Sequence, residues 1–108
     1  MHITLTNFKT NYFNFPKAEI YAAHYYDGSL ALIIVNPDNG DEDRLTTNVE
    51  CVTPGCVVVA NYSENEGLAQ EMERHDLGVI EKEVPIGYGT GYRFRLSESF
   101  KEALSISN

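Results

Sequence analysis

The chain has 108 residues, of which 43% are hydrophobic and 22% charged, a composition typical of one globular domain and not of a disordered or fibrous protein. Acidic residues number 16 and basic residues 8, so the formal net charge is −8 and direct binding to a nucleic-acid backbone is disfavoured. No apolar stretch approaches the roughly 20 residues of a membrane span, and the first residues do not resemble a signal peptide. We expect a single cytoplasmic domain over residues 1–108, without membrane association.

The first third of the chain predicts β-structure. Residues 1–15 are rich in β-branched and aromatic side chains, although the sequence does not show what they pair with. Residues 19–26 and 29–36 flank Asp27-Gly28, a dipeptide that tolerates the positive φ angles of a tight turn, and therefore predict an antiparallel hairpin. The second of these strands is apolar on both faces. It is expected to lie centrally in a sheet and to be covered on both sides.

Two further strands are predicted after an acidic turn. Residues 44–52 alternate in polarity, which is typical of a half-buried strand, with Leu45 on the buried face and Thr46 on the solvent face. A Pro54-Gly55 turn leads into the apolar residues 56–62. The two segments are expected to pair with each other.

A helix is predicted over residues 64–77. Ser63 and Glu66 have the spacing of a capping box, in which each side chain bonds the other residue's backbone amide. The left-handed residue that ends the helix is expected to be Gly78, as in a Schellman motif. The apolar face of this helix consists of Leu68, Ala69 and Met72.

The last third predicts a short strand at residues 79–85, a glycine-rich connection, and a strand at residues 92–96. Ser97 is expected to cap a final short helix. The fold class is therefore α+β: a mainly antiparallel sheet of about five strands, with the capped helix packed on one face and a short C-terminal helix. If the other face of that sheet is uncovered, its apolar residues favour a homodimer.

No metal or cofactor site is predicted. Cys51 and Cys56 lack a second pair of ligands at zinc-binding spacing, and both are expected to be ordinary reduced thiols. The acidic residues 37–43 do not match the register of a calcium-binding loop.

The glycine-rich segment Gly87–Gly91 has neither the third glycine nor the following helix of a dinucleotide-binding fingerprint, so it predicts a bulged turn with Tyr88 exposed as a contact residue. Glu71 and His75 lie four residues apart on one helical face. They form either an acid/base pair or a structural contact. No catalytic residue is assigned, and the sequence leaves open whether the protein is an enzyme.

The order of the motifs "GSLALIIV", "LTTNV", "NYSENEGL", "HDLG" and "GYGTGY" resembles a family of small uncharacterised bacterial proteins catalogued as a domain of unknown function. Members are accessory proteins of plasmids, phages and other mobile elements of Gram-positive bacteria. The resemblance implies this context without implying a mechanism. The positions of this chain that belong to the family motif are Asn48, Asn65, Gly67 and Gly87.

Two classes of function remain. The first is a non-enzymatic interaction module, such as a mobile-element regulator or defence modulator, whose acidic surface binds a basic protein. The second is a small-ligand-binding protein or small hydrolase that uses the glycine-rich loop and the adjacent helix. The residues expected to bind in the first class are Glu64, Glu66, Glu71 and Glu73, with Tyr88 as an exposed contact.

Overall fold

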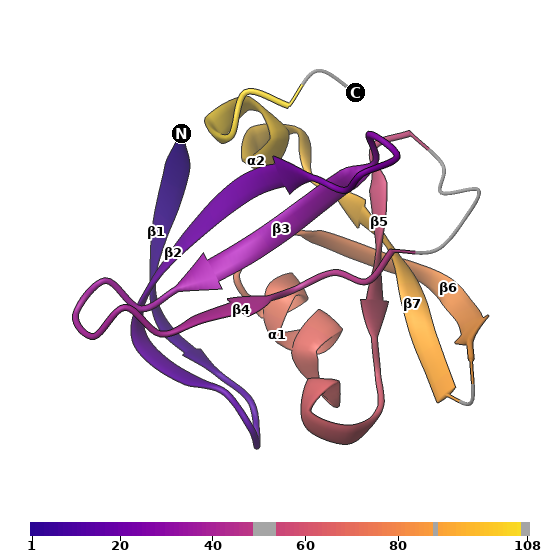
Figure 1. Ribbon diagram of the computed structural model, residues 1–108, viewed down its shortest axis with the longest axis horizontal. Helices are drawn as coiled ribbons and strands as arrows, with labels where there is room; N and C mark the ends of the chain where they lie inside the picture. The colour runs from indigo at the N-terminus through magenta and orange to yellow at the C-terminus, as the bar shows by residue number, and fades with distance from the viewer. Residues whose placement is uncertain (49–53, 88, 107–108) are drawn as a thin grey trace.

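The computed structural model of the protein describes residues 1–48, 54–87 and 89–106. The strands in these ranges form two antiparallel sheets, sheet A in the order β1-β2-β3-β4 and sheet B in the order β5-β7-β6. Figure 1 shows α2 near the top of the view, α1 near the bottom, and β4 running towards β5. In chain order the elements are β1 (His2–Lys9), β2 (Asn14–His24), β3 (Leu30–Val35), β4 (Glu42–Arg44), β5 (Cys56–Ala60), the 3₁₀ helix η1 (Ser63–Asn65), α1 (Leu68–Arg74), β6 (Gly78–Ile86), β7 (Gly89–Leu96) and α2 (Glu98–Ala103).

The α+β class and the antiparallel pairing are confirmed, but the prediction of a single sheet of about five strands is wrong. The N-terminal segment, whose partner the sequence did not show, pairs with β2 along its whole length, from His2 opposite Tyr21 to Lys9 opposite Asn14. The hairpin between β2 and β3 is present as predicted, and Gly28 in its turn has a φ of 89°. This hairpin forms the middle of sheet A.

The segment predicted as one strand over residues 44–52 divides between the two sheets. The N–H of Leu45 donates to the carbonyl of Leu32 in β3 at 2.8 Å. Two residues later, the N–H of Thr47 donates to the carbonyl of Val58 in β5 at 2.9 Å. The chain therefore crosses from sheet A to sheet B at this point, which is why the strands do not form one sheet. Residues 49–52 of the predicted strand lie outside the described ranges.

Thr46 lies at this crossing, and its predicted place on the solvent face is wrong. Only 5% of its surface is exposed. Its hydroxyl accepts the N–H of Leu32 at 3.2 Å and lies 2.8 Å from the hydroxyl of Tyr25. A side chain thus replaces the backbone partner where the ladder between β3 and β4 ends, since a buried N–H needs an acceptor.

One hydrophobic core lies between the sheets and includes residues of both helices. In β3, Leu32 and Ile34 are fully buried in this core, whereas Ile33 and Val35 on the outer face are only half-buried. The central position of β3 is confirmed, but its expected coverage on both sides is only partial. The largest fully buried side chains are Phe8, Phe94, Ile20, Leu32, Ile34, Leu45, Leu68, Met72, Val57 and Val59.

The first helix begins later than predicted, at Leu68. Ser63 has a φ of 55°, and η1 has no side-chain cap, so the predicted capping box with Glu66 is wrong. Glu66 is extended, with φ −61° and ψ 130°, and Gly67 then adopts a left-handed φ of 83°. The amide of Gly67 is satisfied by Asn61, whose side-chain oxygen accepts it at 3.2 Å. A glycine-dependent corner therefore replaces the first turn of the predicted helix.

The helix does end in a Schellman motif, but the left-handed residue is Asp76 and not Gly78. Asp76 has a φ of 61°, its N–H donates to Glu73, and the N–H of Leu77 donates to Met72 at 3.1 Å. Gly78 has a different role, because a Cβ there would overlap the carbonyl oxygen of Arg95 and the ring of Phe94. It permits the close approach of β6 to β7.

The C-terminal part follows the prediction closely. Phe94 and Leu96 of β7 are buried on one face, and Tyr92 on the same face is half-buried. The hydroxyl of Ser97 accepts the N–H of Phe100 at 3.2 Å, which is the predicted N-cap of α2. Among the described residues, no helix has the length and apolarity that crossing a membrane requires.

Candidate functional site

The four carboxylates singled out in the sequence have different roles in the structure. Glu64 and Glu66 are exposed, on η1 and in the link to α1. Glu73 is half-buried, and its carboxylate accepts the N–H of Ile80 at 2.7 Å, which fastens the end of α1 to β6. Glu71 is only 8% exposed and faces β1. Two of the four carboxylates, Glu71 and Glu73, therefore stabilise the fold by accepting backbone amides of β1 and β6.

Glu71 holds the outer edge of β1. Its Oε2 accepts the backbone N–H of Lys9 at 2.8 Å, and its Oε1 accepts the Nε–H of Arg74 at 2.8 Å. Arg74 also donates to the backbone carbonyl of Asn7 at 2.6 Å. Burial raises the pKa of Glu71, but the bonds from Arg74 and the Lys9 amide outweigh this effect, so its pKa lies below the ordinary glutamate value.

His75 completes this cluster as a packing residue. Its ring stacks on Phe8 with centroids 5.4 Å apart. Its Nε2 lies 3.2 Å from the Oε2 of Glu71 and 3.3 Å from the carbonyl of Asn7. Phe8 is fully buried, so the contact predicted between Glu71 and His75 links α1 to the core and to β1.

The remaining predicted positions lie apart from that cluster. Asn48 accepts a hydrogen bond from the hydroxyl of Ser29 at 3.2 Å, and Gly87 has a φ of 52° between β6 and β7. Tyr88 and Cys51 lie outside the described residues. The next glycine, Gly89, has no room for a Cβ, because the ring of Tyr62 packs against it. The described glycines of the loop thus have structural roles.

Cys56 belongs to a polar cluster on the outer face of sheet B. Its sulfur lies 3.6 Å from Glu81, whose two oxygens accept from the Nε of Arg93 at 2.8 Å and the Nε of Arg95 at 2.6 Å. Burial raises the pKa of the Cys56 thiol, and the hydrogen bond from Arg95 lowers the pKa of Glu81. The cluster fixes β6 against β7 and leaves Cys56 a protonated, buried thiol at neutral pH.

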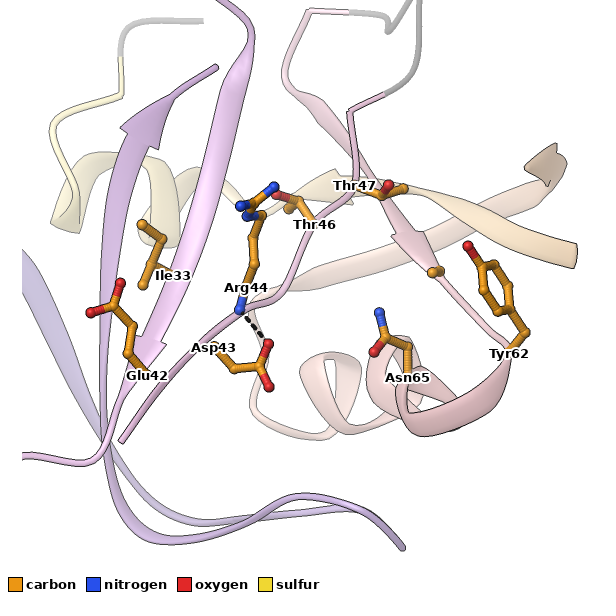
Figure 2. A pocket seen from close by; sticks show the side chains of 9 residues that line it. Ile33, Glu42, Asp43, Arg44, Thr46, Thr47, Tyr62 and Asn65 are labelled. Atoms are coloured by element: carbon orange, nitrogen blue, oxygen red, sulfur yellow. Dashed lines mark hydrogen bonds between the residues drawn. The ribbon is translucent and has the colours of Figure 1, made fainter. Parts of the chain in front are cut away.

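A groove lies on the surface of the described part of the chain, between β4 and the segment formed by β5 and η1. It is a cavity of about 510 Å³. Figure 2 shows Asp43 and Arg44 on one side, Tyr62 and Asn65 on the other, and Thr47 at the end where β4 and β5 converge. This volume lies within the range of ligand-binding clefts. We call this hollow the β4–β5 groove.

Charge distinguishes the β4–β5 groove. Glu42 and Asp43 line it and are exposed, and they continue an acidic turn that includes Asp38 and Asp41. Arg44, the basic residue of the lining, lies over the ring of Tyr25, with its guanidinium carbon 5.5 Å from the ring centroid. Sequence reasoning treated this acidic segment as a solvated turn, because nothing local shows that it borders a groove.

Of the four positions that the resemblance to a family had indicated, Asn48, Asn65, Gly67 and Gly87, Asn65 alone lines the β4–β5 groove. In the described ranges, including the groove, no three side chains of His, Cys, Asp or Glu come together as a metal site requires. Comparisons with protein-family models, curated proteins and solved structures found no match to this chain. Function has to be inferred from the site itself.

Proposed function

We propose that this protein is a non-enzymatic interaction module whose β4–β5 groove binds a basic segment of a partner protein. The observation that carries this proposal is the coincidence of the groove with the exposed carboxylates Glu42 and Asp43. The two carboxylates lie on one wall of the groove, so a cationic segment that enters the groove would also meet a negative field.

The pairing of charges elsewhere supports this assignment. Arg74 pairs with Glu71, Arg93 and Arg95 pair with Glu81, and Lys101 pairs with Glu98. Half of the 8 basic residues are therefore already engaged with carboxylates. The acidic stretch from the β3–β4 turn into β4 has no such ion pair among the described residues, and it carries much of the uncompensated negative charge.

The partner class follows from the charge and from the resemblance of motif order described above. In this proposal the protein is an accessory factor of a mobile element that regulates, or modulates the defence against, a protein with a basic surface. Charge attraction of this kind speeds association and weakens as salt increases.

The alternative of a small-ligand binder or hydrolase has less support. Both oxygens of Glu71 already accept hydrogen bonds, from Arg74 and from the backbone of Lys9. His75 is packed on Phe8. A carboxylate held in this way by its own fold is poorly placed to take a proton from a substrate.

The test is the affinity of a fluorescently labelled lysine-rich peptide, measured by anisotropy at about 0.01 M and about 1 M salt, where the Debye length falls from roughly 30 Å to 3 Å. The double variant Glu42→Gln/Asp43→Asn should bind about tenfold more weakly at low salt, since each exposed charge contributes up to about 1 kcal/mol. Glu83→Gln/Glu102→Gln is the matched control, because it removes two exposed charges elsewhere.

Equal losses in the two double variants would show that the acidity acts diffusely, and equal affinity at both salt concentrations would remove the electrostatic basis. Light scattering of the protein without peptide reports whether it forms a homodimer, for which the half-buried outer face of sheet A is the expected contact.

A further inference from the structure

The groove-facing edge of β4 carries backbone groups that point away from β3. The backbone hydrogen bonds from the N–H of Leu45 to the carbonyl of Leu32 and from the N–H of Asn36 to the carbonyl of Asp41 fix the phase of the antiparallel ladder. In that phase Asp43 faces β3, and the N–H and C=O groups of its two neighbours, Glu42 and Arg44, point into the groove. The N–H of Arg44 is capped by the Asp43 carboxylate at 2.8 Å, the bond drawn in Figure 2.

The facing edge of β5 has the same property. Bonds from Asn61 to Thr90 and from Leu96 to Gly55 fix the phase of the ladder between β5 and β7. The backbone N–H and C=O groups of even-numbered residues in β5 therefore point away from β7. Val58 uses its carbonyl to accept from Thr47, and the next such residue, Ala60, lines the groove.

We infer that the basic segment binds in extended conformation, as an added strand between β4 and β5 that joins sheet A to sheet B. This inference rests on the proposed function, because it names how the same groove holds its partner. Two strand edges that converge on one groove offer donors and acceptors on both sides, which is the arrangement that strand addition requires.

The other outer edges of the sheets are less suited to accept a strand. On β1, the N–H of Lys9 is bonded by Glu71 and the carbonyl of Asn7 by Arg74. On β6, Pro85 has no N–H, and the pairing with β7 shifts register between Ile80 and Lys82, which makes the strand irregular there. Prolines and irregularities of this kind protect edge strands from pairing.

Side-chain alternation gives the segment a specific pattern. A strand beside β4 places one residue opposite each of Glu42, Asp43 and Arg44, on the same face as that residue. Two adjacent basic residues opposite the carboxylates and a neutral residue opposite Arg44 satisfy all three. The three residues of β4 span roughly 10 Å, so the contact with this edge involves about three residues of the partner.

The test uses a labelled peptide of Lys-Lys-Thr repeats and the same peptide with every second backbone amide N-methylated. Methylation leaves the charge unchanged but removes backbone donors. We expect it to weaken binding at low salt about tenfold or more, since several hydrogen bonds are lost. Hydrogen exchange of the Glu42 and Ala60 amides should slow when the unmethylated peptide is bound, whereas the Lys82 amide on β6 should not change.

A pair of protein variants separates charge from backbone. Glu42→Gln removes the charge alone, and Glu42→Pro also removes the groove-facing N–H at an edge position that tolerates proline. We expect the proline variant to bind about two- to tenfold more weakly than the glutamine variant, provided that both keep the circular dichroism spectrum of the parent.

The outcomes separate the two proposals. Equal binding of the methylated and unmethylated peptides, with no protection at Glu42 or Ala60, would overturn strand addition and leave the acidic interaction module in place. No binding of either peptide at low salt would overturn the proposed function, and the inference with it.

Discussion

The two outer edges of sheet A, on β1 and β4, differ in whether another part of the chain bonds their backbone groups. On β1 the C-terminal end of the edge is closed, because Glu71 and Arg74 of α1 bond the Lys9 amide and the Asn7 carbonyl. On β4 the edge borders a groove, and among the described residues the carboxylates of Glu42 and Asp43 bond no other helix or strand. Glutamates occur at both edges, so residue type alone does not separate a structural carboxylate from one available to a partner. What separates them is whether another part of the chain supplies the donor.

The closed edge should be the more sensitive to mutation. Glu71→Ala leaves the Lys9 amide without its acceptor and Arg74 without its pair, and we expect a loss of about 2–3 kcal/mol in the free energy of unfolding. Urea denaturation monitored by circular dichroism measures it, and Glu83→Ala, at an exposed position of β6, is the control. A loss no larger than that of the control would show that the edge is held by packing alone.

The closed edge should also make stability depend on pH. The folded pKa of Glu71 is lowered, so its contribution is present above the unfolded value of about 4.3 and is lost as the pH falls through the lower folded value. Glu71→Gln should remove this part of the acid destabilisation. Parallel loss of stability below about pH 4 in the parent and the variant would assign the acid sensitivity to other groups.

The left-handed corner at Gly67 places α1 against β1, so a substitution there should also affect stability. Gly67→Ala puts a Cβ on a residue with φ 83°, which should cost about 1–2 kcal/mol of stability in thermal or urea unfolding. The neighbouring substitution Glu66→Ala, at an extended and exposed position, should change stability by less than about 0.5 kcal/mol. Equal effects of the two would contradict the left-handed corner.

The open edge should show the smallest effect on stability. Glu42→Gln removes an exposed charge that bonds no other element in the described part of the chain, and we expect the free energy of unfolding to change by less than about 0.5 kcal/mol. The same variant should weaken binding of the lysine-rich peptide. A large loss of stability here would mean that the β4 edge, like the β1 edge, serves the fold.

Several elements could be predicted because their signals are local. The turn at Gly28, the N-cap at Ser97 and the buried face of β7 each depend on a few neighbouring residues, and the structure confirms all three. The start of α1 was mispredicted because Ser63 and Glu66 have the spacing of a capping box, yet Gly67 makes a left-handed corner after them. Local spacing allowed two solutions there, and packing selected one.

The candidate site was harder to predict than the fold. The sequence placed binding residues on a helix predicted over residues 64–77, but two of these carboxylates, Glu71 and Glu73, accept backbone amides of β1 and β6. The groove depends on where the chain leaves sheet A at Thr46 and joins Val58 of sheet B. No local pattern encodes that crossing, since it depends on contacts between segments distant in the sequence.

By itself the sequence determined an acidic α+β domain with antiparallel strands, because charge, alternation of polarity and turn residues act over short distances. The tertiary structure alone decided that the strands form two sheets, that the edge of β1 is closed by α1, and that β4 and β5 diverge to leave a groove. These features depend on which donor meets which acceptor across the molecule, and that pairing is settled only when the two sheets pack around their common core.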